Sequence, residues 1–189
     1  MKVLVFLAAG FEEVEAVTPI DYLRRAEIEV VTVSITDELV VRGSHGIQIT
    51  ADKTIQEIAG ADGYDALILP GGSAGAANLA TSPELAALLK GAVEKKKLLC
   101  AICAAPVMVL ADKGYLKDHL FTCYPGTEEK IDFLGSASGA KWAQERVVID
   151  KNLITSRAAG TAGAFSLAII ESLTGKESAN RIAASVLLS

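Results

Sequence analysis

The feature that most constrains the fold of this chain is the alternation of short apolar or β-branched runs with segments of helical character. The apolar runs lie at residues 3–7, 30–34, 66–69 and 98–102, and helix-like stretches follow several of them. Strands that are apolar throughout are typical of a parallel sheet whose two faces are both covered by helices. The pattern therefore predicts a flavodoxin-like three-layer α/β/α sandwich with a mostly parallel sheet.

The remaining segments complete this pattern. Residues 39–49 contain two short strand-like pieces around a turn at 43–46, which indicates a hairpin. Further strands are expected at 121–123, 147–149 and 153–155, and helices at 15–26, 83–95, 106–113, 161–173 and 177–187. Because no repeat, low-complexity stretch or linker interrupts the chain, we expect residues 1–189 to form a single domain.

The composition of the chain argues against several classes of protein. With 189 residues, 51% of them hydrophobic, the chain can bury a sizeable core, and its net charge of −5 argues against a nucleic-acid surface, which needs a basic patch. It has no run of about 18 apolar residues, so we expect no membrane helix. The apolar run at 3–9 is short and acidic residues follow it, which fits a buried strand better than a signal peptide. We therefore expect a cytoplasmic protein whose three cysteines stay reduced.

Chemically active residues gather in the loops that follow the apolar strands. In open α/β sheets, ligands bind beyond the carboxyl ends of the strands. The loops at this edge are expected at 8–15, 70–75, 103–105, 124–126 and 157–161. Together they hold a thiol, several carboxylates, a guanidinium, a phenol and many glycine amides, so we expect the site among them.

Cys103 lies where a buried strand is expected to give way to a helix. This is the geometry of a nucleophile elbow, and the small residues around Cys103 in AICAA fit its sharp turn. The N-terminus of the following helix favours the thiolate, so we expect a lowered thiol pKa. The alternative is that Cys103 is a small apolar residue that ends a strand.

The other two cysteines carry weaker signals. Cys100 forms a C-x-x-C with Cys103, but residues three apart on a strand face opposite sides. We therefore expect no disulfide and a core position for Cys100. Cys123 lies at another strand end, where we expect it to be structural or a bystander.

A reactive cysteine needs a partner that handles its proton, and histidine is the usual one. The two histidines, His45 and His119, lie outside the loops at the carboxyl edge, and we expect both on the surface. Among the nearby carboxylates, Glu12 and Glu13 are expected to be solvated. Glu15 remains as the candidate partner because it falls in the first turn of the first helix.

The neighbours of Glu15 support this choice. Pro19 has no N–H, so the Glu15 carbonyl lacks its usual helical hydrogen bond, and the helix is expected to kink or to restart with Thr18 as its cap. Partial burial beside a thiolate raises a carboxyl pKa, so we expect Glu15 to be protonated near neutral pH and to carry a proton during reaction. The alternative is an ordinary carboxylate that favours the helix dipole.

Backbone amides complete the candidate site. Gly71 and Gly72 allow close approach of the main chain, and with the amide of Ala104 they would form an oxyanion pocket. Pro-Gly-Gly by itself is equally compatible with an ordinary tight turn.

Four motifs occur in order along the chain: GFEEVEAVTPIDYLRRA, YDALILPGG, CAICAAP and LITSRAAGTAGAFSLAIIESLTGK. In this order they resemble the landmarks of the ThiJ/PfpI superfamily, in the branch of the parkinsonism-associated protein deglycase and its small bacterial relatives. The resemblance implies a flavodoxin-like homodimer with a nucleophilic Cys103, a protonated partner at Glu15 and backbone donors at Gly72 and Ala104. Activities attributed to the superfamily are cofactor-free glyoxalase chemistry, deglycation of protein adducts, holdase chaperone action and peroxide sensing through cysteine sulfinate.

The chain departs from this superfamily at three places. Tyr124 stands where some members have a histidine, which argues against a histidine-assisted mechanism and leaves one based on glutamate. Ala104 stands where the protease branch has a histidine, so we expect no protease activity. Ala158 and Ala159 replace a Gly-Pro beside the pocket, so substrate preference is expected to differ. The residues expected to line the pocket are Gly71, Tyr124, Arg157 and Ala158.

These residues support two functions of different classes. The first is a glyoxalase or deglycase-type enzyme in which Cys103 adds to a small 2-oxoaldehyde such as methylglyoxal and Glu15 is the acid and base, with no cofactor, metal or nicotinamide required. The second is a redox sensor or stress chaperone with little turnover, in which Glu15 stabilises a Cys103 sulfinate. Both use the same residues, so the sequence does not separate them. A flavin-binding module is a third, weaker possibility that rests on the fold alone.

Overall fold

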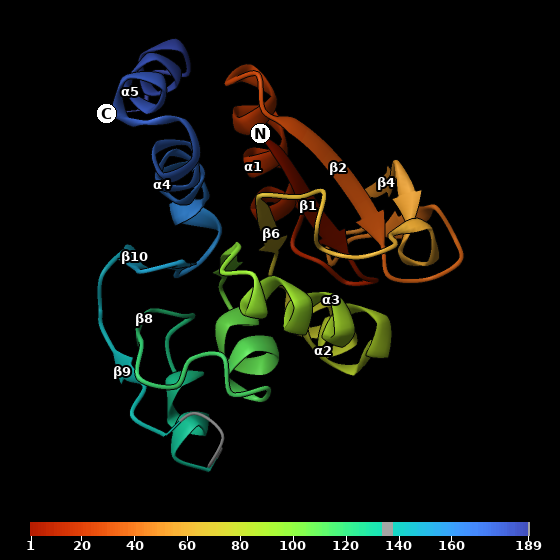
Figure 1. The fold of residues 1–189 in the computed structure, drawn as a ribbon, viewed down its shortest axis with the longest axis vertical. Coiled ribbons are helices and arrows are strands. Elements are labelled where there is room, and N and C mark those ends of the chain that lie inside the picture. Colours follow the sequence, from red (N-terminus) through yellow and green to blue (C-terminus); the bar gives the residue numbers. More distant parts are fainter. Residues whose placement is uncertain (134–137, 189) are drawn as a thin grey trace.

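The structure is a computed structural model that describes residues 1–133 and 138–188 and contains one central sheet (Figure 1). The strands of this sheet are β1 (Lys2–Leu7), β2 (Glu29–Ser34), β5 (Lys53–Thr54), β6 (Ala66–Leu69), β7 (Leu98–Ile102), β10 (Val147–Asp150) and β11 (Leu153–Ser156). They lie in the order β10-β11-β7-β6-β1-β2-β5. Every neighbouring pair is parallel except β10 with β11, so the predicted, mostly parallel sheet is confirmed.

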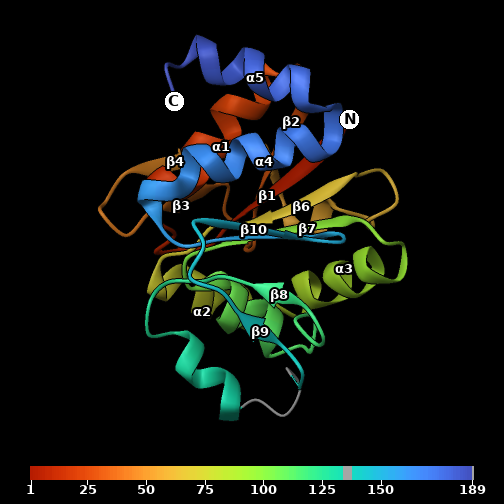
Figure 2. The same ribbon diagram turned by 90° about the vertical axis from the view of Figure 1, so that its left-hand side faces the viewer.

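Helices cover both faces of the sheet (Figure 2). One face carries α1 (Glu13–Arg25), α4 (Ala162–Thr174) and α5 (Lys176–Ser185), and the other carries α2 (Ser73–Thr81), α3 (Pro83–Glu94) and the π-helical segment η2 (Pro106–Ala111). Successive residues of a strand point to opposite faces, so Val3 and Val5 join one core while Leu4 and Phe6 join the other. Because both faces are buried, the central strands β6 and β7 are apolar throughout. The flavodoxin-like three-layer fold is confirmed.

Smaller elements lie outside the central sheet. The predicted hairpin is confirmed by β3 (Val40–Arg42), which pairs antiparallel with β4 (Gln48–Thr50). A second small sheet joins β8 (Leu120–Phe121) to β9 (Lys141–Trp142). Short 3-10 segments occur at η1 (Ile55–Glu57), η3 (Glu128–Phe133) and η5 (Ala159–Thr161). Within the described parts of the chain, no helix is long and apolar enough to span a lipid bilayer.

Two local predictions differ from the structure. Helix α2 was not predicted, because its alanine- and glycine-rich sequence lacks a clear apolar periodicity. The helix expected at 106–113 is π-helical and ends at Ala111. Both segments lie on the same face of the sheet and follow strands whose ends approach the candidate site.

Helix α1 forms without the break expected at Pro19. It continues from Glu13 to Arg25 with Pro19 inside it, so the predicted restart at Thr18 is wrong. The cap is Glu12, whose carboxylate accepts the N–H of Glu15 at 2.7 Å. Because the N-terminus is capped in this way, the helix tolerates the loss of one hydrogen bond, the one that the Glu15 carbonyl cannot accept because Pro19 has no N–H.

Candidate active site

Cys103 directly follows β7 and adopts a strained backbone conformation. Its φ of +66° lies in the left-handed region, which is uncommon for a residue with a side chain. The Cys103 N–H donates to the Ser156 carbonyl at 3.0 Å, and the Cys103 carbonyl accepts the Tyr124 N–H at 2.8 Å. These bonds hold the sharp turn and leave the side chain partly exposed, which confirms the predicted elbow.

Glu15 brings a carboxyl group to this thiol from the first turn of α1. The residue is 1% exposed, and its carboxyl contacts the Cys103 side chain. The Gly71 N–H donates to Glu15 Oε2 at 2.9 Å. Burial nevertheless raises the pKa of the Glu15 carboxyl to about 7, as the sequence analysis predicted.

The pKa of the thiol moves in the direction opposite to the prediction. Burial and the neighbouring Glu15 carboxylate raise the pKa of Cys103 to about 12. The amides of Gly72 and Ala104 lower the thiol pKa, as expected, but burial raises this pKa by more. Thiol and carboxyl therefore ionise as a pair, and thiolate forms when the carboxyl holds the proton.

Two glycines allow the loop after β6 to reach this pair. A Cβ atom on Gly71 would lie 2.5 Å from both Cys103 Cβ and Glu15 Oε2, closer than real atoms approach. Gly72 has a φ of +84°, which a side chain rarely adopts. The loop thus places main-chain donors against both the carboxyl and the sulfur.

A cavity of about 540 Å³ opens at the thiol. Its lining residues are Ser73, Cys103, Ala104, Met108, Tyr124, Pro125, Gly126, Thr127 and Lys130. Gly71, Arg157 and Ala158, which were expected to line the pocket, are not among the described residues that line this cavity. Arg157 Nη1 donates to the Gln144 carbonyl at 3.3 Å, and the Ala158 N–H donates to Thr161 Oγ1 at 3.1 Å. Contact of these residues with a substrate stays a prediction.

The remaining cysteines and histidines lie apart from this pair. Cys100 is fully buried in the core, as predicted, and all three cysteines are free. Cys123 is also buried, with its Sγ 3.8 Å from Glu128 Oε2. The His45 side chain is 73% exposed, as expected, whereas that of His119 is only 18% exposed and pairs with Asp150 at 2.9 Å. The surface prediction for His119 is therefore wrong.

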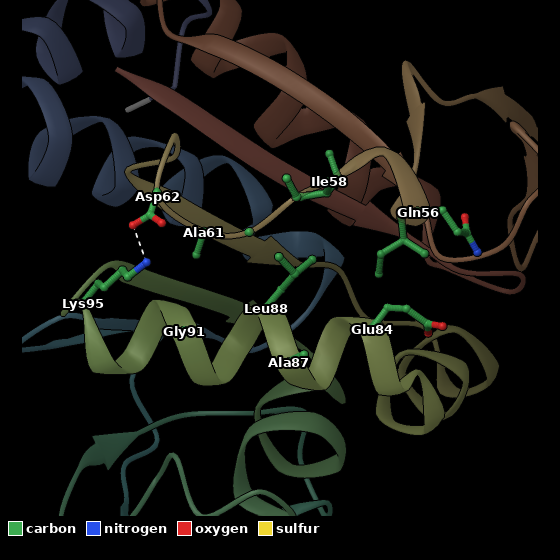
Figure 3. A pocket seen from close by; sticks show the side chains of 12 residues that line it. Gln56, Ile58, Ala61, Asp62, Glu84, Ala87, Leu88, Gly91 and Lys95 are labelled. Atoms are coloured by element: carbon green, nitrogen blue, oxygen red, sulfur yellow. Dashed lines mark hydrogen bonds and ion pairs between the residues drawn. The ribbon is translucent and has the colours of Figure 1, made fainter.

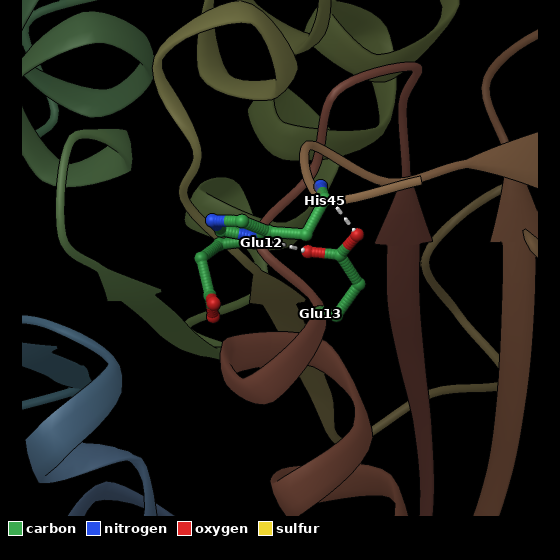
Figure 4. Close-up of side chains that lie close together, drawn as sticks. All are labelled: Glu12, Glu13 and His45. Atoms are coloured by element: carbon green, nitrogen blue, oxygen red, sulfur yellow. Dashed lines mark hydrogen bonds and ion pairs between the residues drawn. The ribbon is translucent and has the colours of Figure 1, made fainter. Parts of the chain in front are cut away.

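Glu13 is buried, although the sequence analysis placed it in solvent. It is 4% exposed, and the hairpin between β3 and β4 surrounds its carboxylate (Figure 4). The carboxylate accepts the His45 N–H at 2.7 Å and the Ser44 hydroxyl at 3.1 Å, and it pairs with His45 Nδ1 at 2.9 Å. Burial opposes ionisation, but these hydrogen bonds outweigh it and lower the pKa of Glu13 to about 2.

Glu12, Glu13 and His45 are close enough together to be considered as metal ligands. Among the described residues they form the one group of this kind, with candidate ligand atoms within 4.8 Å of one another. Glu12 caps α1, however, and the oxygens of Glu13 already accept hydrogen bonds from the hairpin. The cluster is therefore satisfied by donors of the chain itself and joins the hairpin to α1.

A second cavity, of about 450 Å³, lies between α3 and the segment that precedes β6 (Figure 3). Its lining residues are Ile55, Gln56, Ile58, Ala59, Gly60, Ala61, Asp62, Glu84, Ala87, Leu88, Gly91 and Lys95. Asp62 and Lys95 form an ion pair with each other. The lining contains no thiol or imidazole, so nucleophilic chemistry points to the Cys103 cavity.

A model of the DJ-1/PfpI family matches residues 1–172 of the chain. The chain is 37% identical over 187 residues to the Parkinson disease protein 7 homolog of Danio rerio, which covers 99% of this chain and 97% of that protein. It is 31% identical over 189 residues to the glutathione-independent glyoxalase DJ-1 of Schizosaccharomyces pombe, over 96% of each protein. The solved structure of oxidized DJ-1 from Toxoplasma gondii has a TM-score of 0.89 and 39% identity, over 98% of this chain and 97% of that one. With matches over nearly its whole length, this chain belongs to the DJ-1/PfpI family.

Proposed function

We propose that this protein is a cofactor-independent enzyme of glyoxalase or deglycase type that acts on small 2-oxoaldehydes such as methylglyoxal. The observation that carries the proposal is the contact between the Cys103 thiol and the Glu15 carboxyl, whose pKa near 7 suits proton transfer at neutral pH. The name of the fission yeast relative, a glutathione-independent glyoxalase, supports the same class of reaction.

The first step forms a bond between the Cys103 sulfur and the aldehyde carbon. The thiol proton passes to the Glu15 carboxylate as the sulfur attacks, because a thiol with a pKa of about 12 holds little free thiolate. The aldehyde oxygen becomes an oxyanion, which the amides of Gly72 and Ala104 stabilise. Return of the proton from Glu15 to this oxygen completes a hemithioacetal.

Glu15 then moves a proton between the two carbons of the adduct. Its carboxylate removes the proton from the former aldehyde carbon, which gives an enediolate, and returns it to the neighbouring carbon. The hydroxyl proton on the former aldehyde carbon passes to the oxygen of the neighbouring carbon, which leaves a thioester of the 2-hydroxy acid. Water attacks the thioester carbonyl, and the thiol leaves with a proton as the 2-hydroxy acid forms. The net reaction adds one water to the oxoaldehyde and consumes no oxidant or reductant.

Conversion of methylglyoxal to the 2-hydroxy acid tests this proposal. We expect wild-type protein to turn over and Cys103→Ser to fall to the background rate. Cys123→Ala is the matched control, because it removes a buried thiol that is not among the lining residues of the cavity. Wild-type turnover by Cys103→Ser, or no turnover by the wild-type protein, would contradict the proposal.

Peroxide sensing at Cys103 is a second candidate function. Its thiol is partly exposed and contacts a carboxyl that can donate to an oxidised sulfur, and the Toxoplasma relative has been solved in an oxidized form. Intact mass measured after graded peroxide tests this candidate. A gain of two oxygens located on Cys103 supports it, and equal oxidation of all three cysteines opposes it.

We also propose that the chain forms a homodimer. Apolar side chains are exposed on α1 and on the adjoining hairpin, namely Val14, Val17, Leu39, Val40 and Ile47. Sedimentation velocity tests this proposal, with Val17→Asp expected to shift a dimer toward monomer. A monomeric wild-type protein would contradict it.

A further inference from the structure

A smaller cavity, of about 200 Å³, lies at the amino ends of β7 and β11, whereas Cys103 follows the carboxyl end of β7. It is bordered by the end of α3, by the segment between η2 and β8, and by the first residues of β7 and β11. Its lining residues are Val93, Lys96, Leu99, Gly114, Tyr115, Lys117, His119, Asn152 and Leu153. Among the described residues that line it, none is acidic, so the lining is basic in a chain whose net charge is −5.

The two lysines of this lining have no acidic partner. The ammonium groups of Lys96 and Lys117 make no ion pair or hydrogen bond with the residues that the structure describes. In the cavity between α3 and the segment before β6, by contrast, Lys95 pairs with Asp62. Two unpaired cations at one small cavity repel each other, and a bound anion would relieve this repulsion.

His119 adds a partly buried ring to the same lining. Its Nδ1 lies 2.9 Å from Asp150 Oδ2, an oxygen that also accepts the Leu120 N–H at 2.9 Å. This interaction fixes the ring and leaves Nε2 as the ring atom that is available to a ligand. When the ring is protonated, Nε2 can donate a hydrogen bond to an anion.

Tyr115 supplies a neutral donor to this lining. Burial and the charge of Glu94 raise the pKa of its hydroxyl, so the hydroxyl keeps its proton at neutral pH. Two acidic residues, Glu94 and Asp150, lie close to the cavity, but neither is among its lining residues. Asp150 is also engaged by His119 and by the Leu120 N–H, so it does not neutralise the two lysines.

The backbone at Lys96 gives an independent reason to assign a role to its side chain. Lys96 ends α3 with a φ of +53°, where its N–H and that of Lys97 donate to the carbonyls of Val93 and Ala92. Glycine is the usual residue at this position, because it adopts a positive φ without strain. A lysine here therefore brings a cation to the cavity at a backbone cost that glycine would avoid.

We propose that this cavity binds a phosphate group, held by the ammonium groups of Lys96 and Lys117 and by the ring of His119. Phosphate carries up to two negative charges near neutral pH and accepts several hydrogen bonds at once, which matches two lysines and a histidine. The cavity is small, so the ligand is either free phosphate or the phosphate end of a small monoester. This site lies apart from Cys103 and does not depend on the function proposed above.

The chain has only two histidines, so their NMR signals report on the site and supply a control. Inorganic phosphate is titrated into isotope-labelled protein at constant pH, with sodium chloride adjusted to hold the ionic strength constant. We expect the ring signals of His119 to shift to saturation, with half-saturation at about 1 mM, while those of His45 stay in place. A parallel titration with glycerol 2-phosphate separates the two sources of phosphate. Binding of the monoester at least as tight as that of phosphate assigns the site to a monoester, and tighter binding of phosphate assigns it to the free ion.

Lys96→Gly removes one cation and relieves the backbone at the same time. Glycine readily adopts a φ of +53°, so urea unfolding should show this variant to be at least as stable as wild type. The phosphate concentration at half-saturation should rise by about tenfold, as it should in Lys117→Gln, because each variant loses one charge-assisted hydrogen bond.

Lys151→Gly is the matched control. Lys151 also has a positive φ, of +58°, and is adjacent to Asp150 in the chain, but it is not among the lining residues. Its loss should change the half-saturation concentration by no more than about twofold.

Two kinds of result would overturn the inference. If His119 shows no saturable shift, or if His45 responds as strongly, phosphate acts only as a general ionic solute. If Lys96→Gly and Lys151→Gly weaken binding equally, the effect belongs to the overall surface charge and not to this cavity. Because Lys96→Gly is expected to be stable, its loss of affinity cannot be attributed to unfolding.

Discussion

Glu13 and Glu15 stand two positions apart in the first turn of α1, and both are buried, yet they ionise in opposite ways. The pKa of Glu13 is lowered to about 2, and that of Glu15 is raised to about 7. Their exposed fractions, 4% and 1%, are nearly the same. Solvent exposure by itself therefore does not explain which carboxyl keeps its charge, and Glu15 also lies much deeper in the protein than Glu13.

The difference comes from the greater depth of Glu15 and from the donors that surround each carboxyl. Glu13 receives main-chain and side-chain hydrogen bonds from Ser44 and His45, and these stabilise the carboxylate. Glu15 receives one strong main-chain hydrogen bond, from Gly71, and otherwise meets the Cys103 thiol and the charge of Glu12. The Glu13 carboxylate thus stays charged and has a structural role. The Glu15 carboxyl has a pKa near neutral pH, where it can both take up and release a proton.

The largest contrast should appear in turnover. Loss of a general acid–base group costs about 10²–10⁴ in rate, so Glu15→Gln should lower methylglyoxal turnover by at least that factor. Glu13→Gln should cost far less, because the Glu13 carboxylate is bonded to Ser44 and His45 of the hairpin, whereas the Glu15 carboxyl contacts the Cys103 thiol. Steady-state rates of both variants measure the contrast, and equal losses would show that the two carboxyls do not differ in role.

A second contrast concerns the free energy of unfolding above pH 7. The folded state holds the Glu15 proton more tightly than the unfolded state, so stability is lost as pH rises from about 4.5 to about 7. Each pKa unit corresponds to about 1.4 kcal/mol, so the loss is on the order of 3 kcal/mol. Glu15→Gln should remove this slope and be more stable than wild type above pH 7. Urea unfolding across this range measures it, and a slope that persists in Glu15→Gln would contradict the assignment.

Glu13→Gln should have the opposite effect on stability. Removal of a hydrogen-bonded charge should destabilise the protein by about 1–3 kcal/mol at neutral pH. Because the folded-state pKa of Glu13 is depressed, this contribution is present above about pH 4.5 and disappears as pH falls to about 2. Urea unfolding at neutral and acidic pH measures it. A difference between variant and wild type that does not shrink in acid would contradict the sign.

The smallest effect is expected at His45. Its ring is mostly exposed, and in His45→Gln the main-chain N–H still donates to Glu13. The ring pKa is raised by its hydrogen bond to Glu13, so the stabilisation is present below about pH 6.5 and is lost as pH rises through the folded-state pKa. Thermal unfolding should show a smaller loss for His45→Gln than for Glu13→Gln, with turnover unchanged. Equal losses would mean that the ring, and not the main chain, stabilises the Glu13 carboxylate.

Local patterns predicted those parts of the molecule that depend on local physics. Wholly apolar runs predicted the buried strands, and the small residues of AICAA predicted the sharp turn at Cys103. The choice of Glu15 rested on the position of its loop, and its raised pKa followed from burial. The thiol pKa was wrong in direction because the effect of the following amides was visible in the sequence while the depth of burial was not.

The order of strands and helices and the spacing of apolar residues suffice to predict the parallel sheet, its covered faces and a cysteine at its carboxyl edge. How the acidic groups ionise depends instead on the packing of the folded chain. The donors to Glu13 come from a hairpin about 32 positions along the chain, and the donor to Glu15 is the N–H of Gly71, 56 positions away. Ionisation depends on the distance and burial of charges in space, which no local pattern of residues contains.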